Sequence, residues 1–334
     1  KNNTYLGIAR NFRRYGWLYL LLYGSSPLAN NSFAKDRDHD LEELNSDDIY
    51  KPYATSLRMG DLGYISEAQD SLNISYNSIE DYCADLKNAL ETSYPLYKKI
   101  GEFNGDERVQ LNDSIIQIEN ELYDTIRPKR TSSEGLRPAN ALKEHGIEYV
   151  EIRGVDISPD ALGGISKDQM HFLDLFLIHC FITNSSKLTD EENVRLQKNH
   201  TDMVSSGQNN STVIFYKGKE AAIGDAMADL VNELSLLAKN LDGETRTYTD
   251  ALKSVTTSKN QSAAILSSLT DSKEFHDIAL EKSIQNTQEL RQNKSLDLNY
   301  LKQESEESLK RFKEIEDKVA DTIRSSSGMS SRVA

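Results

Sequence analysis

The chain has 334 residues, with 53 acidic and 39 basic side chains and a net charge of −14 at pH 7, which allows one large domain or two ordinary ones with a buried core. The acidic excess argues against nucleic acid or an anionic membrane as a partner, because both require a basic face, whereas a nucleotide stays possible if a metal ion offsets its phosphates. Two cysteines, Cys83 and Cys180, are too few and too far apart for a disulfide framework or a zinc site, so we expect a reducing cytoplasm.

Residues 4–23 predict a helix that ends at Gly24. The basic pair Arg13 and Arg14, followed by an apolar turn, also imitates a twin-arginine secretory signal. We prefer an internal helix, because the chain starts with Lys1 rather than methionine and we expect it to be a piece of a longer protein. The apolar run is far shorter than the ~20 residues of a membrane span, so no membrane partner is expected.

The next stretches read as a polar surface loop at 25–50, a short mixed segment at 53–64, and a helix from Ser78 to about Thr92. Asn77 and Glu80 have the spacing of a capping box at the start of that helix. In isolation, Arg58 fits an ordinary surface arginine and Tyr64 fits a packing aromatic.

Two stretches between 115 and 156 predict β-strands, because apolar and polar residues alternate with period two. In the first stretch, the polar face holds Gln117, Glu119, Glu121 and Tyr123, and the apolar face holds Ile116, Ile118, Leu122 and Ile126. In the second, the apolar residues Val150 and Ile152 alternate with Tyr149, Glu151 and Arg153. This pattern predicts one antiparallel sheet with helices behind it and a charged face in front. Carboxylates and an arginine on such a face suit magnesium and a nucleotide phosphate.

Between these strands, the basic run from Arg127 to Arg130 is either a phosphate-binding cluster or an ordinary basic loop. A short helix at 138–144 is expected to end at Gly146. Capping patterns then predict helices that start at Ser166 and Thr189. From 216 to 324 the chain is almost all helix, and the last helix has one apolar edge that could pack on the domain or on a partner.

The chain contains four longer distinctive runs: RNFRRYGWLYLLLYGSSP near the start, KPYATSLRMGDLGY at 51–64, IENELY followed by RPKR, and GIEYVEIR. Together these runs closely resemble the proteobacterial-type glutamate–cysteine ligase family. The resemblance covers residues 5 to about 185 and implies a glutamine-synthetase-like α+β fold, in which helices wrap an antiparallel sheet. We expect 1–185 to be the catalytic-sheet portion, 186–324 a mostly helical part of the same domain, and 325–334 a disordered tail.

The resemblance also implies a reaction, in which ATP phosphorylates the γ-carboxyl of glutamate and the amine of cysteine attacks the acyl phosphate. It assigns Glu151 to magnesium and Arg153 to the transferring phosphoryl group. The remaining candidates are Arg58, Tyr64 and Tyr123 for cysteine, Lys129 and Arg130 for phosphate, and Glu121 as a second, weaker magnesium ligand. The family's N-terminal metal ligands have no counterpart here, so the isolated chain is expected to turn over poorly or not at all.

Three alternatives stay open. The chain could be a related ligase with another amine acceptor, or a non-catalytic acidic helical interaction module. Glu151 and Arg153 could also form an ordinary exposed ion pair on a sheet, which contributes only about 0–1 kcal/mol. We expect a monomer whose partners are the small molecules glutamate, cysteine and ATP.

Overall fold

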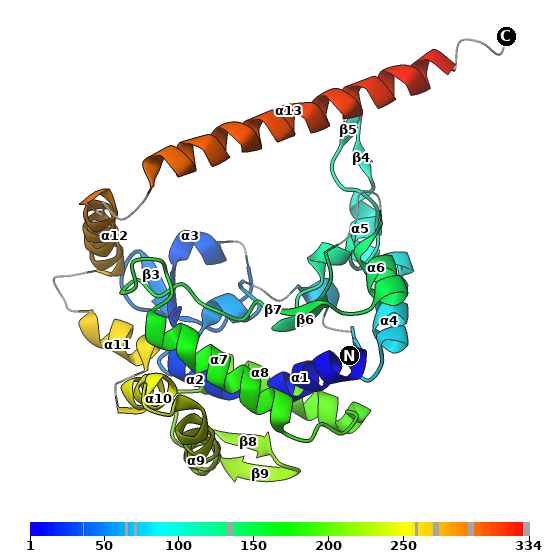
Figure 1. Cartoon of the computed structure of the whole chain (residues 1–334). Helices are drawn as coiled ribbons and strands as arrows, with labels where there is room; N and C mark the ends of the chain where they lie inside the picture. Colours follow the sequence, from blue (N-terminus) through cyan, green and yellow to red (C-terminus); the bar gives the residue numbers. More distant parts are fainter. Residues whose placement is uncertain are drawn as a thin grey trace. The chain divides into compact units, whose positions relative to one another are not determined.

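The computed structural model describes residues 1–35, 37–63, 66–69, 72–131, 136–257, 260–269, 274–292 and 297–329. It divides into two compact units, Lys1–Ile278 and Ala279–Ala334. Helices dominate, and all strand pairs among the described residues are short and antiparallel (Figure 1). The predicted α+β class is therefore confirmed. No helix in the described ranges is both long and apolar enough to cross a membrane.

The predicted first helix is present but divided at Gly16, into α1 (Asn2–Tyr15) and α2 (Trp17–Tyr23). A Cβ atom at Gly16 would lie 2.6 Å from the carbonyl oxygen of Phe12, so only glycine fits this junction. Every residue of α2 is buried. The two arginines before the junction pair with acids of the same unit, Arg13 with Asp124 and Arg14 with Glu192.

Three predicted helix starts are capped by side chains. Ser166 caps α7 (Lys167–Ile182) and Thr189 caps α8 (Asp190–Ser206), as their spacing predicted. For α4 (Ile79–Glu91) the cap is Ser78 rather than Asn77, so that prediction was wrong by one residue. The side chain of Asn77 instead exchanges two hydrogen bonds with the main chain of Leu188, each 2.8 Å long. The other helices in this half are α5 (Pro95–Ile100) and α6 (Pro138–His145), and α6 ends at Gly146 as expected.

Three stretches contain strands that the sequence did not reveal. The expected loop at 25–50 forms a three-stranded sheet of β1 (Leu28–Asn30), β3 (Asp48–Tyr50) and β2 (Glu42–Glu43), with α3 (Asn31–Ala34) between β1 and β2. The stretch from 216, expected to be almost all helix, begins within a hairpin of β8 (Val213–Tyr216) and β9 (Lys219–Ala222), and helix starts only at Ile223. The turn residues of the hairpin, Lys217 and Gly218, both have positive φ, as a tight two-residue hairpin turn requires. A smaller hairpin pairs β4 (Phe103–Asn104) with β5 (Glu107–Arg108).

The central ribbon pairs β6 (Ile126–Lys129) with β7 (Tyr149–Ile152). The second predicted strand is thus confirmed, but the first was wrong, because 116–125 is irregular and contains only the 3-10 turn η3 (Glu119–Glu121). There, side chains satisfy the backbone in place of a neighbouring strand. The carboxylate of Glu121 accepts from the amide of Gln117 at 2.6 Å, and the side chain of Gln69 bonds the main chain of Glu121 and Tyr123.

The core of the first unit lies between α7 and α1, with α9 (Ile223–Asp242) and α10 (Thr247–Thr257) packed on the other sides of α7. Phe12 contacts Phe176, which stacks on Phe172, and the two α7 rings are fully buried. Because α1 also packs behind β6, this core supports the ribbon from one side (Figure 1). Two further 3-10 turns, η1 (Leu57–Met59) and η2 (Glu67–Gln69), lie near the end of the ribbon.

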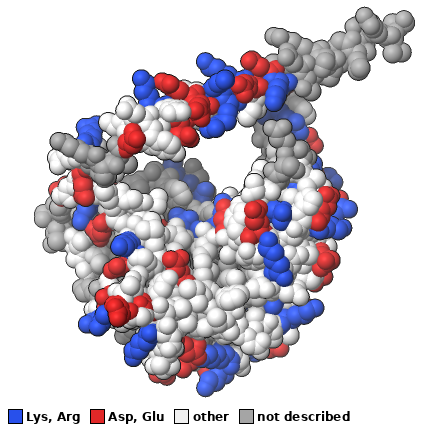
Figure 2. Space-filling model, in the orientation of Figure 1, with Lys and Arg blue, Asp and Glu red and all other residues white. Residues whose placement is uncertain are grey.

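The C-terminal part is helical, as predicted, with α11 (Gln261–Ser268), α12 (Phe275–Gln292) and α13 (Leu298–Met329). In α13 the apolar residues Leu309, Phe312 and Ile315 are exposed. On the face in Figure 2, positive and negative side chains are interspersed over the surface instead of forming a broad basic patch.

Candidate active site

The ribbon β6–β7 has one apolar and one charged face. Residues directly opposite in an antiparallel pair share a face, and the register pairs Ile126 with Ile152 and Arg127 with Glu151. Ile126 is fully buried against the core, whereas the side chain of Glu151 is 37% exposed. The charged face is therefore the one open to a ligand.

Arg127 is the centre of the charged face and is only 4% exposed. Its Nε and Nη2 atoms donate to Oε2 of Glu151 at 3.2 and 2.9 Å. Its Nη1 atom donates to the main-chain carbonyls of Asn120 and Leu122 at 3.1 and 3.0 Å. One guanidinium thus joins the second strand to the η3 turn.

Two more cations lie on the same side. The Nη1 atom of Arg153 donates to the carbonyl of Asn120 at 3.5 Å, so it shares that acceptor with Arg127. The Nζ atom of Lys129 lies 3.8 Å from Oε2 of Glu151 and 3.3 Å from the side-chain oxygen of Asn120. Three positive side chains therefore surround Glu151.

This clustering shifts two pKa values. Partial burial raises the pKa of Glu151, but the hydrogen bond from Arg127 and the three positive charges outweigh it, so the pKa lies below its ordinary value. Burial and the charge of Arg127 lower the pKa of Lys129, against a smaller opposite effect of Glu151. A carboxylate that stays ionised among cations suits a site for a metal ion and an anionic ligand.

The residues of this face fit a magnesium ion that phosphates help to bind. The hydrogen bonds and ion pairs of Glu151 with Arg127 and Lys129 all use Oε2, and within the described ranges Oε1 makes no hydrogen bond or ion pair. Magnesium is often held by one or two carboxylates together with substrate phosphates. The described residues contain no group of three or more His, Cys, Asp or Glu arranged to hold a metal. The second predicted ligand, Glu121, bonds the amide of Gln117 within its own turn.

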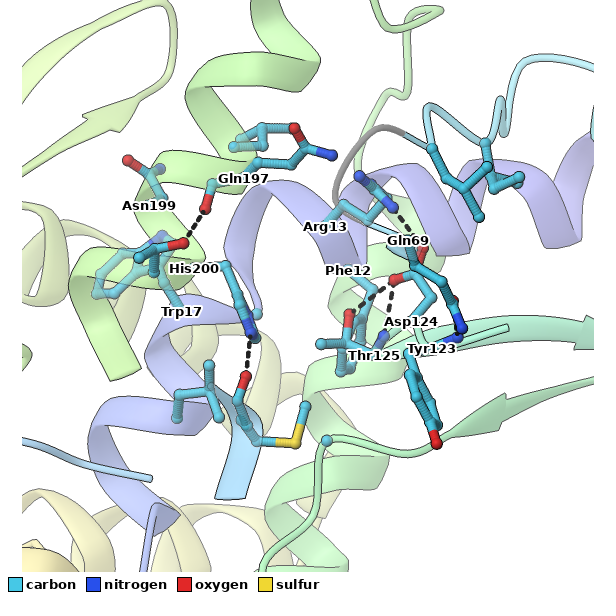
Figure 3. Close-up of a pocket in the computed structure, with 18 of the residues that line it drawn as sticks. Phe12, Arg13, Trp17, Gln69, Tyr123, Asp124, Thr125, Gln197, Asn199 and His200 are labelled. Carbon is cyan, nitrogen blue, oxygen red and sulfur yellow. Dashed lines mark hydrogen bonds and ion pairs between the residues drawn. The ribbon is translucent and has the colours of Figure 1, made fainter. Parts of the chain in front are cut away.

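A cavity of about 390 Å³ opens at the end of the ribbon (Figure 3). Its lining includes Phe12, Trp17, Met59 and Tyr123, together with Leu20, Leu72, Ile74, Leu122 and Leu196. It is bounded by buried polar pairs, in which Arg13 bonds Asp124 at 2.5 Å and the Nε2 atom of His200 bonds the carbonyl of Met59 at 3.1 Å. Burial lowers the pKa of His200, so its ring is neutral at pH 7. Polar side chains, among them Gln69, Gln197 and Asn199, also line the cavity, so it suits a small group with both apolar and polar atoms.

Comparison with known proteins identifies the fold of this site. The family model for glutamate-cysteine ligase matches residues 1–203, which is more than half of the chain. The chain belongs to the glutamate–cysteine ligase family. Glutamate–cysteine ligase of Hahella chejuensis is 44% identical over 208 residues, which are 62% of this chain and 40% of that protein. The enzyme of Pseudomonas putida is 40% identical over 242 residues, 72% of this chain and 46% of that protein.

Superposition on solved structures extends the match beyond the first 203 residues. The crystal structure of glutamate–cysteine ligase from Francisella tularensis, in complex with AMP, superposes with a TM-score of 0.86 at 32% identity. The superposition covers 94% of this chain and 64% of that one. A bifunctional glutathione synthetase from Pasteurella multocida shares the fold at 19% identity, with a TM-score of 0.58 over 86% of this chain and 32% of that one. The chain spans less than half the length of the curated ligases named above.

With the family known, the predicted cysteine-binding residues can be located. Arg58 bonds the buried carboxylate of Asp156 at 2.6 Å and the carbonyl of Val155 at 2.9 Å, so it lies beside the segment that follows β7. Asp156 also accepts from the amide of Ser25. Tyr123 is 41% exposed and lines the cavity. Tyr64 lies outside the described residues.

The two predicted phosphate-binding residues, Lys129 and Arg130, lie in different places. Lys129 lies on the charged face beside Glu151. Arg130 is one residue further on, and its Nη1 atom donates to the carbonyls of His145 and Gly146, at the end of α6. The structure therefore brings Lys129, Glu151 and Arg153 together and directs Arg130 to a helix end.

Arg127 was predicted only as part of a run that forms either a phosphate-binding cluster or an ordinary basic loop, and neither Asn120 nor Asp156 was singled out. The signal for Arg127 was present in the alternation of Ile126, Arg127, Pro128 and Lys129. Shifting the first strand to these four residues would have placed Arg127 opposite Glu151. Nothing in the local sequence marks Asn120 or Asp156, because Asn120 also bonds Arg153, and Asp156 bonds the distant Arg58.

Proposed function

We propose that the complete protein joins the γ-carboxyl of glutamate to the amine of cysteine, at the cost of ATP, through a γ-glutamyl phosphate. Family membership supports this reaction, and the related Francisella ligase was solved with AMP. The observation that carries the proposal is the charged face of the ribbon, where Arg127, Lys129 and Arg153 surround one partly exposed carboxylate, Glu151. Glu119, a second carboxylate near Lys129, still leaves positive charge in excess.

In the first step, a γ-carboxylate oxygen of glutamate attacks the terminal phosphorus of ATP, and the bond from that phosphorus to the bridging oxygen breaks to release ADP. Arg153 and Lys129 would stabilise the negative charge on the transferring phosphoryl group. Glu151 would hold Mg²⁺ through Oε1, and the bound ion would supply additional neutralisation of phosphate charge. Arg130 would assist the phosphates only if its side chain left the end of α6.

In the second step, the cysteine nitrogen attacks the acyl carbon, the carbon–oxygen bond to phosphate breaks, and the amine loses a proton. No covalent nucleophile on the protein is needed, because catalysis rests on holding the two substrates at attack distance. Tyr123 at the cavity, together with Arg58 and Tyr64, would hold cysteine. An arginine suits this role because its planar fork matches a carboxylate, and the cavity beside Tyr123 suits a thiol.

The experiment is an ADP-release assay on the complete protein. Release is expected only when glutamate, cysteine and magnesium are all present. Release that ignores cysteine would overturn the assignment of acceptor, and a related ligase would reveal itself by faster release with another amine. A non-catalytic interaction module would release no ADP with any acceptor.

We also propose the wider organisation expected from the sequence. Residues 1–185 would form the catalytic-sheet portion and 186–324 a helical part of the same domain, in a monomeric cytoplasmic enzyme. Elution of the complete protein as a dimer in size-exclusion chromatography with light scattering would contradict the monomer.

A further inference from the structure

We propose that Arg127 is a positioning residue that fixes the metal-binding carboxylate and the acceptor-binding turn at the same time. It donates to Glu151 on one side and to the main chain just before Tyr123 on the other. The inference rests on the proposed function, because it takes Glu151 as the metal ligand and Tyr123 as a cysteine contact. Arg127 itself contacts neither substrate in this scheme.

The contact with Glu151 fixes which oxygen is available. Both Nε and Nη2 of Arg127 donate to Oε2, and Lys129 lies nearest to the same atom. A guanidinium is planar, so two donors on one acceptor hold the carboxylate at a defined angle, which a lysine ammonium cannot do. Oε1 is thereby left for a cation.

The contact with the turn fixes the approach to Tyr123. Nη1 donates to the carbonyls of Asn120 and Leu122, which flank the last residue of η3. Leu122 directly precedes Tyr123. Arg153 also donates to the carbonyl of Asn120, so the proposed phosphoryl-binding arginine depends on the same turn. Partners of this kind commonly orient ligand-binding groups, and their loss costs about 10- to 100-fold in metal affinity or activity.

The ion pair of Arg14 with Glu192 has a different geometry from the pair of Arg127 with Glu151. Arg14 donates from Nε to Oε1 of Glu192 at 2.7 Å and from Nη2 to Oε2 at 3.0 Å. Both oxygens of Glu192 are thus occupied by one guanidinium. Arg127 instead occupies one oxygen of Glu151 with two donors, and this difference is what leaves the other oxygen for a ligand.

The test compares Arg127→Lys, Arg14→Lys and Glu151→Gln in the complete protein. Binding of Mn²⁺ with ADP, followed by water-proton relaxation, should weaken about tenfold or more in R127K and in E151Q, and stay within about twofold of the wild type in R14K. Hydrogen exchange of the amides of Glu121 and Leu122 should become faster in R127K only, because E151Q keeps the bonds from Arg127 to the turn.

The outcomes separate this inference from the proposed function. Wild-type affinity and exchange in R127K, with weakened binding in E151Q, would overturn the role of Arg127 alone. Wild-type affinity in E151Q would overturn the metal ligand itself, and with it the proposed function. If R127K lacks the circular dichroism of a folded chain, R127Q, which introduces no buried charge, takes its place and must show the same two changes.

Discussion

The two ribbons β6–β7 and β8–β9 have the same length and strand direction but differ in how their charged side chains are paired. At β8–β9, Lys217 bonds two carboxylates, Asp229 and Glu233, and Lys219 adds a second positive charge near Asp229. Glu233 also accepts from His179. At β6–β7 three cations surround one carboxylate, Glu151. A cluster whose charges are matched from within needs no ligand, whereas one with excess positive charge is suited to an incoming anion.

We expect the largest difference between the two ribbons at Glu151. In the complete protein, Glu151→Gln removes the charge that would hold the metal, and we expect turnover to fall by about two to three orders of magnitude. The matched change in the other ribbon, Glu233→Gln, should leave turnover near the wild-type value. The measurement is the steady-state rate of ADP release, and equal losses in the two variants would contradict the distinction between the ribbons.

Arg153 tests the excess positive charge. Replacing it with methionine keeps much of its length but removes the group proposed to stabilise the transferring phosphoryl, so kcat should fall about 100-fold. KM for cysteine should change little, because the residue acts on the phosphate side. A variant that changed only this KM would place Arg153 on the acceptor side instead.

The apolar face of the same ribbon should control stability instead of chemistry. Ile126 is fully buried, and Ile126→Ala should lower the free energy of unfolding by about 2–5 kcal/mol. Chemical unfolding by urea measures this change, with Glu151→Gln as the control from the outer face. If Glu151→Gln lowered the free energy of unfolding more than Ile126→Ala does, the charged face would contribute more to stability than the apolar face, which would contradict this prediction.

The smallest expected effect is the acid sensitivity of the β8–β9 cluster. Partial burial raises the pKa of Glu233, but hydrogen bonds from Lys217 and His179 outweigh it and hold the pKa below its ordinary value. Because the pKa of Glu233 is lower in the folded state than in the unfolded state, its carboxylate stabilises the fold above about pH 4.3, the ordinary glutamate pKa. This stabilisation is lost as the pH falls through the pKa of Glu233 in the folded state. Urea midpoints between pH 6 and pH 3 should therefore fall less in Glu233→Gln than in the wild type, and identical pH profiles would contradict this.

Local sequence predicted those features that local chemistry determines. Ser166 and Thr189 cap their helices because the acceptor and the amide it bonds lie three residues apart. The strand at Tyr149–Ile152 was also recognisable, since its alternation coincides with a real pairing. The resemblance to known ligases supplied the proposed roles of Glu151 and Arg153, which the alternation alone could not.

The failure of the first predicted strand involves a distant partner, Gln69, as well as a local one, Glu121. The alternation from Ile116 to Ile126 satisfied the strand pattern, yet Gln69 and Glu121 bond that backbone in place of a strand. The sequence did not predict which residue lies opposite Glu151. In the structure the paired strand is Ile126–Lys129, and the residue opposite Glu151 is Arg127. A register of this kind is set by the three-dimensional packing of α1 behind the ribbon, which no single segment encodes.

The central claim is that the charged face of β6–β7 binds a metal and a nucleotide through Glu151. The most direct measurement is a crystal structure of the complete protein with Mn²⁺ and ADP, in which anomalous scattering locates the metal. The account predicts a manganese peak at coordination distance from Oε1 of Glu151, with phosphate oxygens within reach of Arg153 and Lys129. A metal and nucleotide bound elsewhere, with Glu151 still contacting only Arg127 and Lys129, would contradict it.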